Sequence, residues 1–145
     1  MAVKPVPDGY RTVTPYLTVS DLRATLDFVE KAFQARVTEL HSGPDGKPRH
    51  AEVEIGDSKV MMGQANEKWG VRNGSLYLYL EDTDGTYARA LAAGAKSIME
   101  PADQFYGDRS AGVEDADGNQ WWLATHVEDV SPEELQRRMA SIPSR

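Results

Sequence analysis

The sequence predicts an α+β fold made of two copies of a β-α-β-β-β module. The first reason is an internal repeat: the segments 14–21 and 75–82 carry hydroxyl, Tyr, Leu, aliphatic and Asp residues in the same order, 61 positions apart. The second reason is that each copy precedes a stretch of helical spacing and then three β-prone stretches. A chain of 145 residues suits a single domain, 1–145, whose modules span 11–64 and 75–126.

In the first module, the strand over 14–21 ends at Asp21, a residue type that favours the N-cap of a helix. Apolar residues recur after it at spacings of three and four, which predicts a helix over 22–33. The three strands that follow are expected at 36–41, 50–55 and 59–64.

In the second module, an alanine-rich stretch predicts a helix over 86–93, ended by Gly94 at the C′ position. Residues 65–74 are expected to link the modules. The remaining strands are expected at 96–100, 110–114 and 120–125.

The two ends of the chain have simpler predictions. Residues 1–10 contain prolines and a glycine and are expected to form an extended arm. Ser131 followed by Pro and two Glu residues is a helix-start signature, which predicts a C-terminal helix over about 131–140.

The composition excludes several classes of function. There are 16 Lys and Arg residues against 23 Asp and Glu residues, which gives a formal net charge of −7 and argues against nucleic-acid and anionic-membrane partners. No apolar run approaches the roughly 20 residues of a membrane-spanning helix, and the N-terminus lacks the apolar stretch of a signal peptide. Because cysteine is absent, disulfides and thiolate chemistry are excluded. We therefore expect a cytoplasmic protein.

The alternation of the strands predicts a ligand pocket. A half-buried strand turns alternate side chains to opposite faces, so one face can pack on the helices while the other carries a different set. The predicted second face mixes aromatic, polar and acidic residues, namely Thr14, Tyr16, His50, Glu52, Met62, Gln64, Ser75, Tyr77, Tyr79 and Trp122. Such a mixture is typical of a concave pocket for an organic molecule. The alternative is a wet sheet surface covered by loops or by a second subunit.

Two features of this set and one residue outside it carry candidate chemistry. His50 and Glu52 are expected about 7 Å apart on one strand face. The pair can be interpreted as a general acid/base pair, as a displaced metal site or as a polar rim of the pocket. The tyrosines and Trp122 either stack on a flat or cationic ligand or fill the pocket as a second core. Arg109 either reaches a ligand anion or shapes its loop through Asp108.

Four stretches of the chain, 13–21, 50–58, 104–119 and 124–134, resemble the glyoxalase/bleomycin-resistance family of the vicinal oxygen chelate superfamily, in the subgroup called PhnB-like. The resemblance implies that the two modules form a curved eight-stranded cup. It also implies a homodimer. The fold hosts lyases, isomerases, dioxygenases and drug-binding proteins, so it does not select a function.

In metal-dependent relatives, four strand residues hold a divalent ion. The resemblance places these positions at Thr14, Met62, Ser75 and Trp122, whose hydroxyl, thioether and indole groups are unsuited to such an ion. It therefore implies a member without metal or other cofactor.

Two functions from different classes follow. The first is a metal-free binding protein that sequesters an aromatic or cationic small molecule, as bleomycin-resistance proteins do. The second is a glyoxalase-like lyase or isomerase that uses His50 and Glu52, with or without a metal. A third and weaker hypothesis is an accessory subunit whose aromatic face binds a protein.

Overall fold

The computed structural model describes residues 2–143, which form eight strands and three helices. The first module comprises β1 (Tyr16–Val19), α1 (Leu22–Phe33), β2 (Arg36–Ser42), β3 (Pro48–Ile55) and β4 (Ser58–Gln64). The second comprises β5 (Ser75–Tyr79), α2 (Thr83–Ala92), β6 (Lys96–Asp103), β7 (Asp108–Glu114) and β8 (Gln120–His126), with α3 (Pro132–Ala140) after it. The predicted α+β fold with two β-α-β-β-β modules is confirmed.

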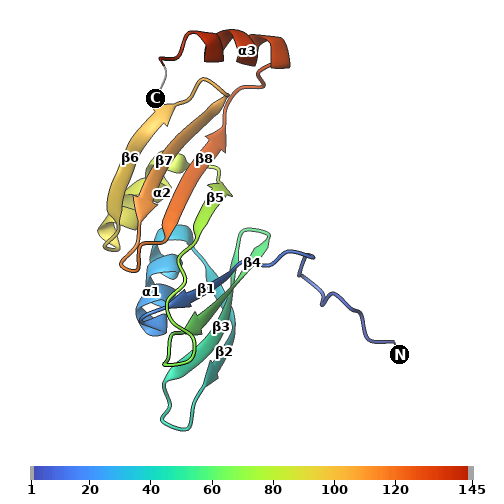
Figure 1. Ribbon diagram of the computed structural model, residues 1–145, viewed down its shortest axis with the longest axis vertical. Helices are drawn as coiled ribbons and strands as arrows, with labels where there is room; N and C mark the ends of the chain where they lie inside the picture. Colours follow the sequence, from blue (N-terminus) through green and yellow to red (C-terminus); the bar gives the residue numbers. More distant parts are fainter. Residues whose placement is uncertain (1, 144–145) are drawn as a thin grey trace.

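The strands divide into two four-stranded sheets with the same topology (Figure 1). Their orders are β1-β4-β3-β2 and β5-β8-β7-β6, with a parallel first pair and antiparallel pairs after it. Between the sheets, β1 meets the linker through one isolated bridge from Thr18 to Arg72. The expected eight-stranded cup is thus built from two separate sheets whose inner edges are β1 and β5.

The helix boundaries follow from their caps. Asp21 accepts a hydrogen bond from the backbone N–H of Ala24 at 3.1 Å, so α1 begins at Leu22 as predicted. Asp82 accepts one from the backbone N–H of Gly85 at 2.9 Å. This second cap starts α2 at Thr83, three residues before the predicted start.

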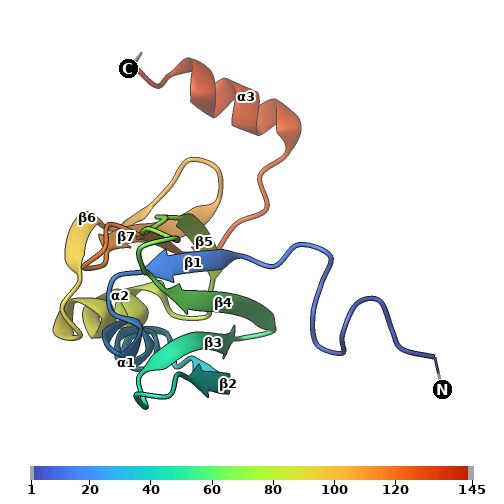
Figure 2. The same ribbon diagram turned by 60° about the horizontal axis from the view of Figure 1, so that its bottom comes forward.

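Both helices cover the same side of the molecule and share one core. α1 and α2 contact each other, and Figure 2 shows them next to each other at the lower left. Phe33 of α1 packs against Trp121 of β8 with ring centroids 4.9 Å apart, and both side chains belong to the buried cluster. The two modules are therefore joined by apolar packing, whose free energy grows with the apolar area buried.

The strand registers correct two predicted faces. Met62 pairs with Ala51 and Leu17, and all three are buried on the helix side. Its predicted place on the second face is therefore wrong; Met61, which pairs with Glu52, lies on that face instead. The alternation of the first strand also predicts Val13 on the helix side, whereas Val13 precedes β1 and is 82% exposed.

The two terminal segments project from this body. The arm before β1 runs away from the sheets, whereas α3 lies beyond the end of the second sheet (Figure 1). Arg138 of α3 donates to the carbonyl of Phe105 and to Glu128, both at 2.9 Å, which ties the helix to the β6–β7 loop. None of the helices formed by residues 2–143 is long and apolar enough to cross a membrane.

Candidate functional site

The open face, as we call the sheet surfaces turned away from α1 and α2, carries a hydrogen-bonded chain on the first sheet. The hydroxyl of Tyr16 lies 3.2 Å from Nδ1 of His50. Nε2 of the same imidazole lies 3.0 Å from a carboxylate oxygen of Glu52. Glu52 is only 8% exposed, and this contact gives its buried carboxylate a polar partner. The predicted His50–Glu52 pair is thus a direct contact, with Tyr16 as a third member.

A glycine makes room for an aromatic ring on each sheet. A Cβ atom at Gly63 would lie 2.7 Å from the hydroxyl oxygen of Tyr16. One at Gly112 would lie 2.5 Å from the six-membered ring of Trp122. Both rings can therefore lie flat on their strands because these positions lack side chains.

The open face of the second sheet is organised by a buried carboxylate. Asp108 is 3% exposed and accepts hydrogen bonds from Tyr77 at 2.7 Å and Tyr79 at 3.1 Å, both at the same oxygen. Its other oxygen lies 3.0 Å from Nδ1 of His126, whose Nε2 lies 2.7 Å from Asp129. The tyrosine rings themselves are 44% and 66% exposed. The cluster thus fixes two aromatic rings at the surface above one negative charge.

These contacts lower the pKa of the carboxyl group and raise the pKa values of its hydrogen-bond partners. Burial raises the pKa of Asp108, but hydrogen bonds from His126, Tyr77 and Tyr79 outweigh it and hold that pKa below its usual value. Hydrogen bonds to Asp108 and then Asp129 raise the pKa of His126. Burial, followed by the hydrogen bond to Asp108, raises the pKa of Tyr77. Asp108 therefore stays anionic while Tyr77 stays a neutral donor.

One buried polar atom beside this cluster has no protein partner. Ser110 is 1% exposed, and its hydroxyl makes no hydrogen bond to any residue among 2–143. It lies on β7 between Asp108 and Gly112, with its side chain on the same strand face as theirs. An unpaired buried hydroxyl costs free energy, so Ser110 keeps one unused donor and acceptor two residues from Asp108.

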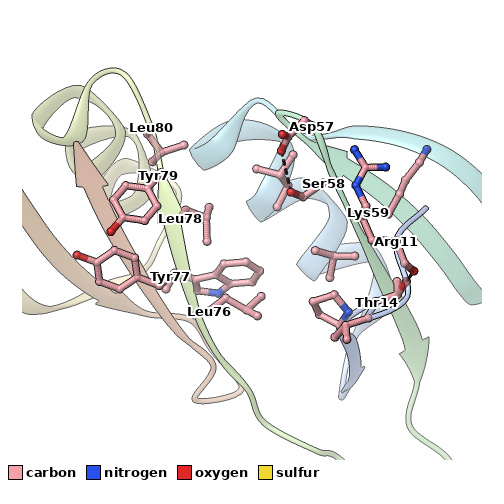
Figure 3. Close-up of a pocket in the computed structure, with 15 residues that line it drawn as sticks. Arg11, Thr14, Asp57, Ser58, Lys59, Leu76, Tyr77, Leu78, Tyr79 and Leu80 are labelled. Carbon is pink, nitrogen blue, oxygen red and sulfur yellow. Dashed lines mark hydrogen bonds between the residues drawn. The ribbon is translucent and has the colours of Figure 1, made fainter. Parts of the chain in front are cut away.

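A cavity of about 500 Å³ separates the two modules (Figure 3). On the β5 side, Leu76, Leu78 and Leu80 point into it, whereas the rings of Tyr77 and Tyr79 extend away from it. The opposite wall comes from the segment before β1 and from β4, and includes Arg11, Thr14, Pro15, Lys59 and Val60. This cavity is largely apolar on the second-module side, and the other side carries the cationic side chains of Arg11 and Lys59 as well as the carboxylate of Asp57.

A smaller hollow of about 390 Å³ lies where the first sheet meets the linker. Its lining includes Tyr16, Gly63 and Gln64 together with Arg49 and Trp69. It lies directly beside the Tyr16–His50–Glu52 chain.

The structure does not bring all predicted site residues together. Tyr16, His50, Glu52, Tyr77, Tyr79 and Trp122 share the open face, and Ser75 begins β5 on the same side. Thr14 lines the inter-module cavity. For three predicted ligand-binding residues, Met62, Gln64 and Arg109, the structure shows another role.

Met62 is buried in the core and cannot meet a ligand. The side-chain carbonyl of Gln64 accepts from the backbone N–H of Leu22 at 2.9 Å, so this residue caps α1. Arg109 pairs with Asp84 of α2 at 3.0 Å and with Asp103 at 3.2 Å, which holds it on the helix side of the sheet.

The residues at the metal positions of the family do not fit a metal ion. The register makes Met61 the counterpart of Trp122, because Tyr16 pairs with the first and Tyr77 with the second. The four positions thus hold Thr14, Met61, Ser75 and Trp122, which lack imidazole and carboxylate groups. Within the part of the chain that the structure describes, no three His, Cys, Asp or Glu residues form a group able to hold a metal.

The sequence reasoning missed Asp108 and His126. β7 was expected to begin at Ser110, whereas it begins at Asp108 and places this carboxylate on the open face. Alternate residues of β8 share a face, so His126, four positions after Trp122, is predicted on the same face as Trp122. The sequence therefore contained a signal for His126. The hydrogen bonds from two tyrosines to one oxygen of Asp108 depend on the arrangement of three strands, so no pattern within a short segment of the sequence predicts them.

Comparisons with known proteins agree with this architecture. An uncharacterized protein of Mycobacterium bovis is 33% identical over 140 residues, covering 89% of this chain and 92% of its own. TioX from Micromonospora sp. ML1 superposes with a TM-score of 0.70 at 24% identity, over 81% of this chain and 99% of that one. A glyoxalase-related enzyme from Fulvimarina pelagi gives a TM-score of 0.62 at 17% identity, over 79% and 88%.

These two solved structures establish likeness of fold, and the PhnB-like subgroup stays a prediction. The sequence matches the Glyoxalase/Bleomycin resistance protein/Dioxygenase superfamily over residues 11–123. The chain belongs to this superfamily.

Proposed function

We propose that this chain is a cytoplasmic, metal-free binding protein that sequesters a flat, cationic organic molecule on the open face of the second sheet. The observation that carries the proposal is the buried Asp108 carboxylate beneath the exposed rings of Tyr77 and Tyr79. Flat ligands stack on such rings, and cations are attracted to their π faces. A nearby anion strengthens that attraction in a partly desolvated site.

Two further features support an organic cation as the ligand. The ring centroids of Tyr77 and Tyr79 lie 5.3 Å apart and their planes are inclined by 59°, so the pair presents π faces in two directions. The net charge of −7 favours the approach of cations over anions. The unpaired hydroxyl of Ser110 adds a hydrogen-bonding group nearby.

The test uses proflavine as a flat aromatic cation and 1-naphthalenesulfonate as a flat aromatic anion. We expect proflavine to raise the melting temperature, because a ligand that binds the folded state stabilises it, and the anion to have a smaller effect. Replacing Tyr79 by alanine should weaken proflavine binding at least about tenfold, a loss of about 1.4 kcal/mol. Fluorescence titration measures both.

The matched control is Tyr87→Phe, which removes a tyrosine hydroxyl that bonds Ser97 and lies on α2. Its affinity for proflavine should equal that of the wild type. The proposal is wrong if no flat cation binds, or if binding survives unchanged in Tyr79→Ala.

A second function is favoured by the chain Tyr16–His50–Glu52. A glyoxalase-like lyase or isomerase moves a proton at a carbon next to a carbonyl group, and an imidazole between a phenol and a carboxylate suits that step. Glu52 would orient the ring and Nδ1 would face the open side near Tyr16.

Solvent deuterium exchange into a panel of α-hydroxy ketones tests this enzyme hypothesis. His50→Gln should lower the exchange rate by about 10²–10⁴-fold, the usual contribution of a general base. His41→Gln is the control. The ring centroids of His41 and His50 lie 6.0 Å apart, but His41 is exposed and does not belong to the Tyr16–His50–Glu52 chain of hydrogen bonds. Equal rates in wild type and His50→Gln would exclude this role.

A further inference from the structure

The hollow of about 390 Å³ beside the linker contains polar groups that neither function above uses. We call it the linker hollow; Thr18 and Asn66 complete the lining named earlier, which includes Tyr16, Arg49 and Trp69. It lies on the first sheet, whereas the surface proposed for cations lies on the second. A ligand of the linker hollow would therefore meet a separate set of residues.

One wall of the linker hollow is a tryptophan that a tight loop holds in place. The backbone N–H groups of Lys68 and Trp69 donate to the side-chain oxygen of Asn66 at 2.9 and 2.8 Å. The backbone N–H of Asn66 donates to the carbonyl of Trp69 at 2.8 Å, which closes the loop. The indole is nevertheless 63% exposed, and the ammonium of Lys68 lies 5.3 Å from its ring centroid. Such a ring offers a face on which a flat aromatic molecule stacks.

Arg49 brings an unpaired guanidinium to the same hollow. Its side chain lies against Gly43, where a Cβ atom would overlap the guanidinium. Several other arginines form ion pairs with carboxylates, whereas Arg49 forms none among residues 2–143. Asp45, in the same hairpin, accepts from the backbone N–H of Lys47 at 3.0 Å. The guanidinium thus keeps its planar set of N–H donors, which matches the two oxygens of a carboxylate.

The groups left free in the lining are mostly donors. Because the side-chain oxygen of Asn66 accepts two backbone N–H groups, its free end is the NH₂ group. Gln64 uses both ends of its amide in hydrogen bonds, and the phenol of the lining belongs to the chain described above. The indole N–H of Trp69 has no acceptor among residues 2–143. Apart from the hydroxyl of Thr18, the unused polar groups are therefore N–H donors, a set that suits an anion.

Basic side chains also gather around this part of the first sheet. Arg23 and Lys47 line an adjoining hollow that shares Gln64 with the linker hollow. The carboxylate in that lining, Asp21, is engaged in the cap of α1. Salt at about 0.1 M screens charges beyond about 10 Å, so nearby side chains decide which ions bind here more than the net charge of the chain does.

We propose that the linker hollow binds a flat aromatic carboxylate. The carboxylate bonds to the guanidinium of Arg49 and to the NH₂ group of Asn66, and the aromatic ring stacks on Trp69. The volume of about 390 Å³ lies within the range of small-molecule sites. The inference goes beyond the proposed function and does not rest on it, because the two sites are on different sheets and take ligands of opposite charge.

The test uses 2-naphthoate as the carboxylate and 2-naphthamide as its neutral counterpart of the same shape. The chain has three tryptophans, whose indole N–H signals are observed in proton–nitrogen correlation spectra and assigned with Trp69→Phe. Trp69 reports the linker hollow, Trp122 the open face of the second sheet, and Trp121 the buried core. We expect 2-naphthoate to shift the Trp69 signal saturably and to leave the other two unchanged. The amide should bind much more weakly.

Arg49→Gln should raise the dissociation constant for 2-naphthoate at least about tenfold, because a charged hydrogen-bond pair is lost. The matched control is Arg36→Gln, which removes the same charge from the same sheet. Arg36 pairs with Glu54 and does not line the hollow, so this variant should bind 2-naphthoate like the wild type. The same spectra measure all three proteins and show whether each is folded.

Three results would overturn the inference. One is the absence of a saturable Trp69 shift with 2-naphthoate, or an equal shift with the amide. Another is an equal loss of affinity in Arg49→Gln and Arg36→Gln, because only the overall charge would then matter. The third is a shift of Trp122 in place of Trp69, which would put the anion on the second sheet and also contradict the preference for cations proposed there. Failure of proflavine to bind would leave the Trp69 result unaffected.

Discussion

Replacing Trp121 by alanine is expected to lower the free energy of unfolding by about 3–5 kcal/mol, the usual cost of removing a large buried aromatic side chain. Trp121 is fully buried and packs on Phe33 of the other module. Its Nε1 donates to a carboxylate oxygen of Asp115 at 3.0 Å, so the substitution also removes one of the two donors to that oxygen, the other being Asn119. Urea unfolding followed by circular dichroism measures the loss.

The neighbouring tryptophan supplies the control. Trp122 lies on the open face over Gly112 and is partly exposed, so Trp122→Ala should cost much less. Similar losses for the two variants would mean that Trp121 does not join the modules as described. The urea m-value should stay constant, because a change in it would signal loss of two-state unfolding.

Replacing Asp108 by asparagine is expected to destabilise the protein by about 1–3 kcal/mol near pH 5.5, because charged hydrogen bonds become neutral ones. The loss should depend on pH at both ends. The pKa of Asp108 is lowered in the folded protein, so its contribution is present above about pH 4 and disappears as the pH falls through the folded pKa. The pKa of His126 is raised, so the contribution of the imidazolium is present below about pH 6.5 and disappears as the pH rises through the folded pKa.

The difference in unfolding free energy between wild type and Asp108→Asn should therefore be largest between about pH 4 and pH 6.5. Thermal and urea unfolding at pH 3, 5.5 and 9 measure it. His126→Gln should remove the decline on the alkaline side and leave the acid side in place. A difference that does not vary with pH would show that the pairing of Asp108 with His126 makes no contribution.

Much of the fold can be predicted from the sequence because its signals are local. Asp21 caps α1 and the helix ends at Phe33, as the spacing of apolar residues predicts. In β5, Leu and Tyr alternate without interruption, and the structure places the leucines toward the core and the tyrosines toward the open face. Strong periodicity in a short segment leaves one arrangement that buries the apolar residues.

The error in β4 has a physical origin. Val60, Met61 and Met62 are consecutive apolar residues, so period two alone does not decide which of them face the core. The pairing with β3 decides it, because Val53 and Ala51 are buried and their partners Val60 and Met62 must share their face. A register of this kind is tertiary information.

The contacts of the candidate site likewise divide into those that the sequence predicts and those that it does not. The contact of His50 with Glu52 follows from their spacing on one strand. By contrast, Asp108 reaches Tyr77 and Tyr79 across β8, and the ion pair of Arg109 with Asp84 joins β7 to α2. Such contacts depend on strand order, which the spacing of residues along the chain does not specify.

The sharing of one Asp108 oxygen by two tyrosines has a kinetic consequence. Each ring is held by its hydroxyl, so neither turns freely, and the ligand that we propose would meet a surface whose rotamers are already set. Little side-chain entropy is then lost when the complex forms. Association rates should accordingly vary little among ligands of the same charge and size, and selectivity should reside in how long each one stays bound.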